Sequence, residues 1–260
     1  MKNKKDIIFS FLIYGIGLLA FLLVDLYVVQ NFTKSNIAEW AFLKSVIIIA
    51  GSICLLGYDH VFIRDSSLIQ RFFRKFNLQS IIIILFFTFL LLFIKQYSIK
   101  KLIVLSISIY LYAILNYLSA SYRAKFNLWK SQLATNFWRL LLLLSVIFIN
   151  YREVNDYFLQ SLLFSLVVML FIGGYKLLKK KENNSVILDD KSAKKLGYSF
   201  LLTNITLIFS VYGEQFLINL QDNTDISSHL FTYVSIFTPV ALCLNGYIGF
   251  YLGQIGRAHV

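Results

Sequence analysis

Charged residues and cysteines are both scarce in this sequence. Asp, Glu, Lys and Arg make up 15% of the 260 residues, whereas a soluble globular chain carries about a quarter. Hydrophobic residues make up 58%, and the mean hydropathy is +0.70. A chain of this length cannot hide so much apolar surface from water. This excludes an ordinary soluble domain and predicts a protein of the lipid bilayer.

Residue patterns needed for several kinds of chemistry are also missing. Cys54 and Cys243 both fall inside apolar runs, so we expect neither a structural disulfide nor a metal site with Cys ligands. The sequence contains no glycine-rich nucleotide-binding loop, no Ser-His-Asp set and no cluster with metal-ligand spacing. We therefore expect no cofactor, no ATP-driven transport and no enzyme.

The apolar residues form runs that are long enough to cross a bilayer as helices, which takes about 20 residues each. The connections between the runs are short, and only 58–77 and 176–195 have a substantial polar content. The sequence predicts eight spans, at about 7–29, 37–57, 78–96, 102–121, 128–149, 155–175, 196–219 and 228–252.

Lys and Arg are distributed unevenly over the two sets of connections, and cytoplasmic loops of membrane proteins carry the excess of these residues. With the N-terminus inside, the outer loops hold five, namely Lys34, Lys95, Lys100, Lys101 and Arg152. The cytoplasmic segments hold seventeen, namely Lys2, Lys4, Lys5, Arg64, Arg71, Arg74, Lys75, Arg123, Lys125, Lys130, Lys176, Lys179, Lys180, Lys181, Lys191, Lys194 and Lys195. The net charge of +12 is therefore interpreted as a topology signal, not as a signature of nucleic-acid binding.

A weak internal repeat lies on either side of the basic segment 176–195. The stretch 25–45 aligns without gaps with 214–234, and each is the end of one span, a short outer loop and the start of the next. This layout is typical of parallel repeats about an axis normal to the membrane. The aligned residues include Asp25 with Glu214, Ile37 with Ile226, and Phe42 with Phe231.

Four ionisable residues, Asp25, Lys44, Arg139 and Glu214, are interpreted as lying deep inside predicted spans. There each charged side chain costs roughly 2.5–3.5 kcal/mol on insertion scales and marks a functional site by default. Arg139 is roughly 16 Å along its helix, near the bilayer midplane. It shares one face of the helix with Gln132, Thr135 and Asn136. A polar face on a membrane helix lines the protein interior or a water-filled cavity. The alternative is that Arg139 only ties helices together by bonding backbone carbonyls.

The other intramembrane polar residues have open interpretations. Lys44 either lines a cavity or extends its aliphatic side chain so that the ammonium group reaches the membrane surface. Asp25 and Glu214, at matching depths, are candidate coupling-ion sites, or else acids that simply end their helices. Asn116 shares a polar face with Tyr112, Ser119 and Arg123, and it either bonds to a neighbouring helix or faces a cavity.

Two segments resemble oligosaccharide flippases, the Wzx-type branch of the MATE-like superfamily. They are "NIAEWAFLKSVIIIAGSICLLGYDHVFIRD" at 36–65, with its Leu56, Gly57, Tyr58 and Arg64 exit, and "SASYRAKFNLWKSQLATNFWRLLLLL" at 119–144. The resemblance extends over nearly the whole chain through loose motifs. It implies an all-α polytopic membrane protein with a MATE-like flippase fold, of which eight transmembrane helices of an expected twelve are present.

The resemblance also implies a function: transfer of a polyprenyl-pyrophosphate-linked oligosaccharide from the inner to the outer leaflet of the bacterial cytoplasmic membrane. The substrate would meet Arg139, Lys44, Gln132, Asn136 and Asn116. Membrane lipid, H⁺ or Na⁺ as coupling ion, a polysaccharide polymerase and chain-length proteins are the implied partners. A MATE-type multidrug or cation antiporter is one alternative. A membrane polysaccharide polymerase or acyltransferase is another, although polymerases usually have a long outer loop.

The predicted organisation follows from this layout. Residues 1–181 form a six-helix bundle, 182–195 a cytoplasmic linker and 196–254 the first two helices of a second bundle. Residues 255–260, "IGRAHV", equal the translation of ATC GGA AGA GCA CAC GTC, part of a widely used short-read sequencing adapter. We interpret them as adapter sequence.

Resequencing the locus from intact genomic DNA tests the adapter interpretation. We expect the codons for 255–260 to be replaced and the reading frame to continue for about four more spans, as a second bundle of the repeat requires. A stop codon directly after Val260 in clean reads contradicts this expectation.

Overall fold

The computed structural model describes residues 4–149, 151, 153–179, 189–221 and 223–237, and within these ranges every regular element is helical. A further helix, at 224–237, follows the last labelled element. The labelled elements are α1 (Lys4–Asn31), α2 (Lys34–Ile53), α3 (Tyr58–Arg64), α4 (Leu68–Lys95), α5 (Ile99–Ala124), α6 (Leu128–Phe148), α7 (Val154–Met169), η1 (Leu170–Gly174), α8 (Tyr175–Lys179) and α9 (Asp190–Leu220).

Seven helices in the described part of the chain are long and apolar enough to cross a membrane: α1, α2, α4, α5, α6, α9, and the continuous run Val154–Leu177. The prediction of an all-α polytopic membrane protein is confirmed at this level. The eighth predicted span, 228–252, begins within the helix at 224–237. The rest of that span, Cys243 and the segment 255–260 lie outside the described residues.

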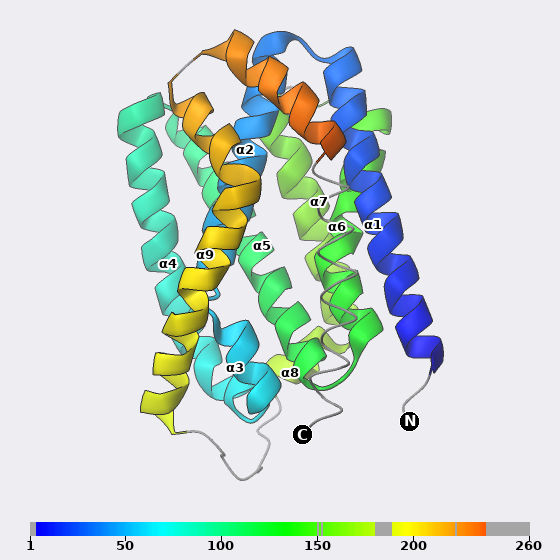
Figure 1. Ribbon diagram of the computed structural model, residues 1–260, viewed down its shortest axis with the longest axis vertical. Coiled ribbons are helices and arrows are strands. Elements are labelled where there is room, and N and C mark those ends of the chain that lie inside the picture. Colours follow the sequence, from blue (N-terminus) through cyan, green and yellow to red (C-terminus); the bar gives the residue numbers. More distant parts are fainter. Residues whose placement is uncertain (1–3, 150, 152, 180–188, 222, 238–260) are drawn as a thin grey trace.

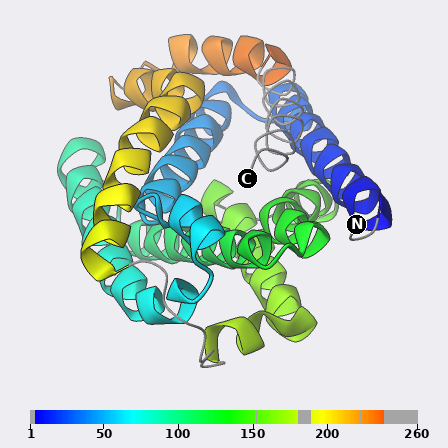
Figure 2. The ribbon, with the colours of Figure 1, turned by 60° about the horizontal axis from the view of Figure 1, so that its bottom comes forward.

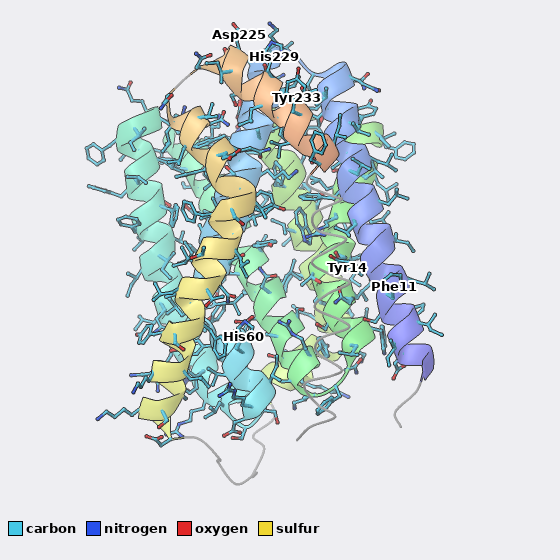
Figure 3. The ribbon with its side chains drawn as sticks, in the orientation of Figure 1. Phe11, Tyr14, His60, Asp225, His229 and Tyr233 are labelled. Carbon is cyan, nitrogen blue, oxygen red and sulfur yellow. The ribbon has the colours of Figure 1, made fainter. Side chains whose placement is uncertain are left out.

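The long helices run alternately up and down, so their connections gather at two ends (Figure 1). One end, here named the basic end, carries the residues 54–67 and 125–127, α8 and the start of α9, and His60 lies there (Figure 3). The opposite end carries the residues 32–33 and 96–98, the end of α6, the start of α7 and the end of α9, and Asp225 and His229 lie there. This grouping matches the two sets of loops that the Lys and Arg distribution separates.

The helix α2 forms the centre of the bundle. Of its most apolar stretch 78% is buried, against 22% for α4 and 17% for α9. It packs against α5 and α9, while α1 packs mainly on α6 at the edge of the ring of helices seen in Figure 2. Large apolar side chains on α1 and α4 point outwards, among them Phe9, Leu12, Phe86 and Phe89. Such faces suit contact with lipid chains.

The polar stretch 58–77 was predicted to be a connection, but it is mostly helical. It forms α3 and the first turns of α4, which has 28 residues. Leu68, Ile69, Phe72 and Phe76 are buried at helical spacing, whereas the intervening Arg71 and Arg74 are exposed. A 28-residue helix is roughly 42 Å long, more than the about 30 Å of hydrocarbon, so its basic turns extend beyond a bilayer.

The helix α9 starts earlier than the span predicted at 196–219. Asp189 caps it by accepting a hydrogen bond from the Ser192 amide at 3.3 Å, and this bonding lowers the pKa of the Asp189 carboxyl. Residues 190–195 of the predicted linker thus belong to the helix, and 180–188 lie outside the described residues. Near the basic end the backbones of Gly57 and Gly197 touch, so that a Cβ on Gly57 would collide with the Gly197 carbonyl.

Reporter fusions test the orientation that the charge distribution predicts. A reporter fused after Lys180 should lie in the cytoplasm, and a reporter fused after Asn223 should lie outside, because the positive residues keep the basic end inside. Paired alkaline phosphatase and green fluorescent protein reporters measure the two locations. External activity at Lys180 or cytoplasmic activity at Asn223 contradicts the orientation.

Candidate functional site

An ion pair between Asp25 and Lys44 lies in the interior of the bundle. The Lys44 ammonium donates to Oδ2 of Asp25, and Trp40 Nε1 donates to Oδ1 at 3.2 Å. Both charged side chains are almost completely buried, at 3% and 4% exposure. Because α2 begins at Lys34, Lys44 lies in the middle of its helix, and its ammonium is paired inside the protein instead of extending to the surface.

Arg139 lies close to this pair, near the middle of α6. Its Nη1 donates to Oδ1 of Asn136 at 3.0 Å, and its buried Nε has no hydrogen-bond partner. The guanidinium carbon is 4.8 Å from the centre of the Phe21 ring, and the Lys44 Nζ is 4.0 Å from the same centre. The Phe21 ring of α1 therefore attracts both cations, and it does so against the repulsion between them.

The three ionised groups form one electrostatic unit. Asp25 is paired with Lys44, and Lys44 and Arg139 both lie against the Phe21 ring. Since Asp25 balances Lys44, Arg139 leaves the unit with one excess positive charge. The interior is a medium in which such a charge attracts anions far more strongly than it would in water.

The polar residues predicted on one face of α6 are connected to one another. Nδ2 of Asn136 donates to the side-chain oxygen of Gln132 at 2.9 Å and lies 3.1 Å from Oγ1 of Thr135. Gly17 of α1 faces them, and a Cβ at that position would collide with the Asn136 side chain. This close approach keeps α1 and α6 together at the level of the stripe.

A polar cavity of about 210 Å³ lies nearer the basic end. Thr135 connects it to the α6 stripe, and Asn116 lines it, so the two predicted polar faces meet in one space. Its lining residues come from α2, the turn that follows it, α3, α5, α6 and α9, and they are Ser52, Leu55, Asp59, Tyr112, Asn116, Ser119, Arg123, Thr135, Asn204 and Ile208.

Two residues of this cavity were missed by sequence reasoning. Asp59 was assigned to a connection, and Asn204 lies beside Thr203 in a predicted span and was not singled out. Oδ2 of Asp59 lies 3.7 Å from Nη2 of Arg123, and Asn204 donates to Oδ1 at 3.5 Å. They join α3, α5 and α9 at the basic end, and only their proximity in the fold reveals it.

Glu214 has a different environment from Asp25, with which it aligns in the repeat. It lies on an exposed face of α9, while its neighbour Gln215 is buried. The buried polar contacts at this end of α9 involve Asn219, which accepts a hydrogen bond from Ser227 at 2.6 Å. The two acids predicted as coupling-ion sites thus do not occupy equivalent positions in the fold.

Comparison of the chain with models of protein families, with curated proteins and with solved structures gives no match. In the described part of the chain, no three His, Cys, Asp or Glu residues are grouped so that they could hold a metal ion. The candidate site has three parts: the charged unit of Asp25, Lys44 and Arg139, the polar stripe of α6, and the polar cavity lined by Asn116.

Replacing Asp25 alone should destabilise the fold much more than replacing both members of the buried pair. Asp25→Asn alone leaves Lys44 and the half-buried Arg139 as neighbouring cations without a carboxylate, which costs about 3–5 kcal/mol, whereas removal of both charges of a buried pair is often close to neutral. Unfolding of the purified variants in a detergent series measures the difference. The exposed pair Lys34 and Asp225 is the matched control, since exposed pairs contribute little.

If the double variant Asp25→Asn/Lys44→Met were as unstable as Asp25→Asn, the two charges would not stabilise one another, and the ion pair would be an incorrect description.

Proposed function

We propose that this chain belongs to a flippase of the bacterial cytoplasmic membrane. It moves an oligosaccharide linked to polyprenyl pyrophosphate from the inner to the outer leaflet for surface polysaccharide synthesis. The observation that carries the proposal is the excess positive charge of Arg139, half-buried next to a connected polar stripe in the middle of a membrane helix. A charge at that depth is expensive and persists where it serves an anionic ligand or an ion path.

The chemistry of the substrate matches the three parts of the site. The guanidinium presents paired planar donors that suit phosphate oxygens. The amide and hydroxyl groups of the α6 stripe and of the polar cavity suit the hydroxyls of a glycan. The lipid tail can stay in the bilayer along outward apolar faces such as that of α1.

A cation antiporter of the same superfamily is the nearest alternative, and the charges argue against it. Such a transporter needs an uncompensated acid for its cationic substrate. Asp25 is the buried acid of the site, and Lys44 neutralises it. For a membrane polymerase or acyltransferase, the described connections at the end opposite the basic end are too short to form the long outer loop that polymerases usually have.

The ion pair also supplies a means of coupling transport to protons. Protonation of Asp25 removes the negative charge that balances Lys44, so two cations then face the anionic head group. Proton uptake and head-group binding would thus favour one another, as thermodynamic linkage requires. Glu214, on an exposed face of α9, lies outside this charge arrangement.

Substitution of Arg139 in the chromosomal gene tests the proposal. Arg139→Ala should abolish surface-glycan export, because the head group loses the charge it would meet at the midplane, while Arg139→Lys should keep a part of it. The readout is surface glycan per molecule of folded protein in the membrane. Arg74→Ala, at an exposed position on α4, is the control and should export normally.

Near wild-type export per folded molecule in Arg139→Ala would remove Arg139 from the substrate path. Reduced protein level with normal export by the surviving molecules would assign it to helix packing instead.

A further inference from the structure

One face of α9 is polar, although it points away from the helices on which α9 packs. Its exposed polar residues recur every three or four positions, so they share one side of the helix. They are Ser199, Thr203, Thr206, Ser210 and Glu214, and they are named here the polar face of α9. Leu202 and Leu207, which are also exposed, border this row.

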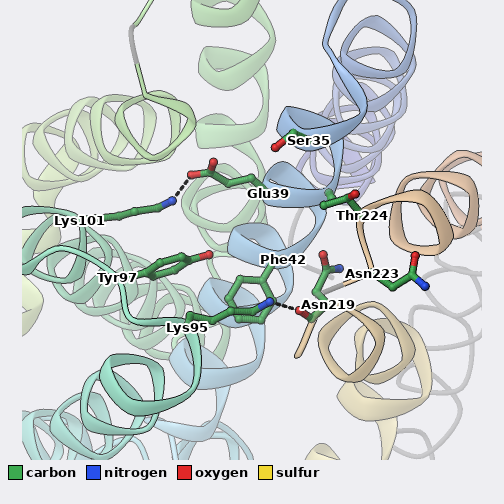
Figure 4. Close-up of a pocket in the computed structure, with 10 residues that line it drawn as sticks. Ser35, Glu39, Phe42, Lys95, Tyr97, Lys101, Asn219, Asn223 and Thr224 are labelled. Carbon is green, nitrogen blue, oxygen red and sulfur yellow. Dashed lines mark hydrogen bonds and ion pairs between the residues drawn. The ribbon is translucent and has the colours of Figure 1, made fainter. Parts of the chain in front are cut away.

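The opposite face of α9 packs the helix on α2 and α3. Asn204 and Ile208 line the polar cavity, and the ring of Phe216 stacks on that of Phe42, with their centres 5.9 Å apart. Phe42 and Asn219 line a further cavity, of about 170 Å³, between α2 and the end of α9 (Figure 4). In the described part of the chain, no hydrogen bond or ion pair joins the polar face to another helix.

Glu214 lies within the membrane-spanning part of α9. It comes six residues before Leu220, the last residue of the helix, which is roughly 9 Å at 1.5 Å per residue. Phe216, two residues further on, stacks on Phe42, which lies eight residues or roughly 12 Å below the exposed start of α2 at Lys34. Half of the hydrocarbon layer is about 15 Å thick, so the Glu214 carboxyl lies inside it.

The hydrogen bonds of the polar face determine which groups suit it. Ser199, Thr206 and Ser210 each donate to a carbonyl oxygen of α9 itself, at 3.1, 3.0 and 2.7 Å. A hydroxyl has one hydrogen to donate, so these groups retain only acceptor capacity, and an ionised carboxylate is also an acceptor only. A hydroxyl bonded in this way is tolerated next to lipid, whereas a carboxylate at this depth faces a protein interior or a water-filled space.

Asp25 shows how this fold accommodates an acid at a corresponding depth. It comes six residues before Asn31 at the end of α1, as Glu214 does before the end of α9. The neighbouring helix α2 supplies it with the Lys44 ammonium and the Trp40 N–H as donors. Among the described residues, Glu214 has no such partner, and a helix that brings a cation to it would complete it in the same way.

We propose that the polar face of α9 binds a further transmembrane helix of the same polypeptide. This helix is one of the spans that the internal repeat predicts after residue 252, and it carries a Lys or Arg opposite Glu214. A second copy of the chain does not suit this face, because a symmetric contact would set acceptors against acceptors and carboxylate against carboxylate. The inference requires only that α9 spans the membrane, and it does not rest on the proposed flippase activity.

Photocrosslinking in the membrane tests the contact. The full-length gene is expressed with p-benzoylphenylalanine in place of Ser210, and crosslinked peptides are mapped by mass spectrometry. We expect a crosslink within one polypeptide, to a span after residue 252 that has a Lys or Arg within about two helical turns of the crosslinked position. The same photoreactive residue in place of Phe86, on an outward apolar face of α4, is the matched control and should give no crosslink to protein.

Charge reversal tests the chemistry opposite Glu214. Glu214→Lys should lower the crosslink yield per folded molecule at least about fivefold, because two cations that face each other inside a protein repel one another. Glu214→Gln, which has the same size and no charge, should lower the yield less. Changing the basic residue of the crosslinked span to Glu should restore the yield in the Glu214→Lys protein.

A crosslinked dimer, a crosslink to a different protein, no crosslink from position 210, or a gene that ends directly after Val260 would each overturn the proposal. Equal yields for Glu214→Lys and the unchanged protein would overturn the cation opposite Glu214. Because the readout is a contact and not glycan export, this contact in a protein that exports no glycan would leave the docking face standing while the proposed function failed.

Discussion

A lysine ammonium in the interior of a membrane protein requires a carboxylate beside it, because the surroundings cannot solvate the charge. Here the carboxylate of Asp25 on α1 meets Lys44 on α2, and Phe21 on α1 contacts both Lys44 and Arg139 of α6. This requirement fixes three helices relative to one another. The close approach of Gly17 to Asn136 also holds α1 against α6.

Features that repeat within one helix could be predicted from the sequence. The spacing of Gln132, Thr135, Asn136 and Arg139 is sufficient to place them on one face, and hydrophobic length is sufficient to find the seven apolar helices. The charged start of α4 was missed because Arg71 and Arg74 lower the local hydropathy. Leu68 and Phe72 are nevertheless four residues apart, as one face of a helix requires, and both are buried.

Features that depend on two helices could not be predicted. Nothing in the sequence around Asp25 indicates Lys44 as its partner, since the pairing depends on how α1 lies against α2. The internal repeat shows the same limit: Phe42 and Phe231 are both buried, but Ile37 is buried while Ile226 is 54% exposed. Similarity of sequence position therefore does not ensure similarity of environment, and Asp59 and Asn204 become neighbours only in the folded chain.

At the contact between Gly57 and Gly197, near the basic end, the backbone of α9 lies directly against the turn before α3 with no side chain between them. Asn219 lies 22 residues further along the helix, roughly 33 Å away at 1.5 Å per residue. A tilt of about 5° about this point moves the far end of the helix by roughly 3 Å, the length of a hydrogen bond. A change of this size in the tilt of α9 at the Gly57–Gly197 contact would be enough to break or form a contact near Asn219, at the opposite end of the helix.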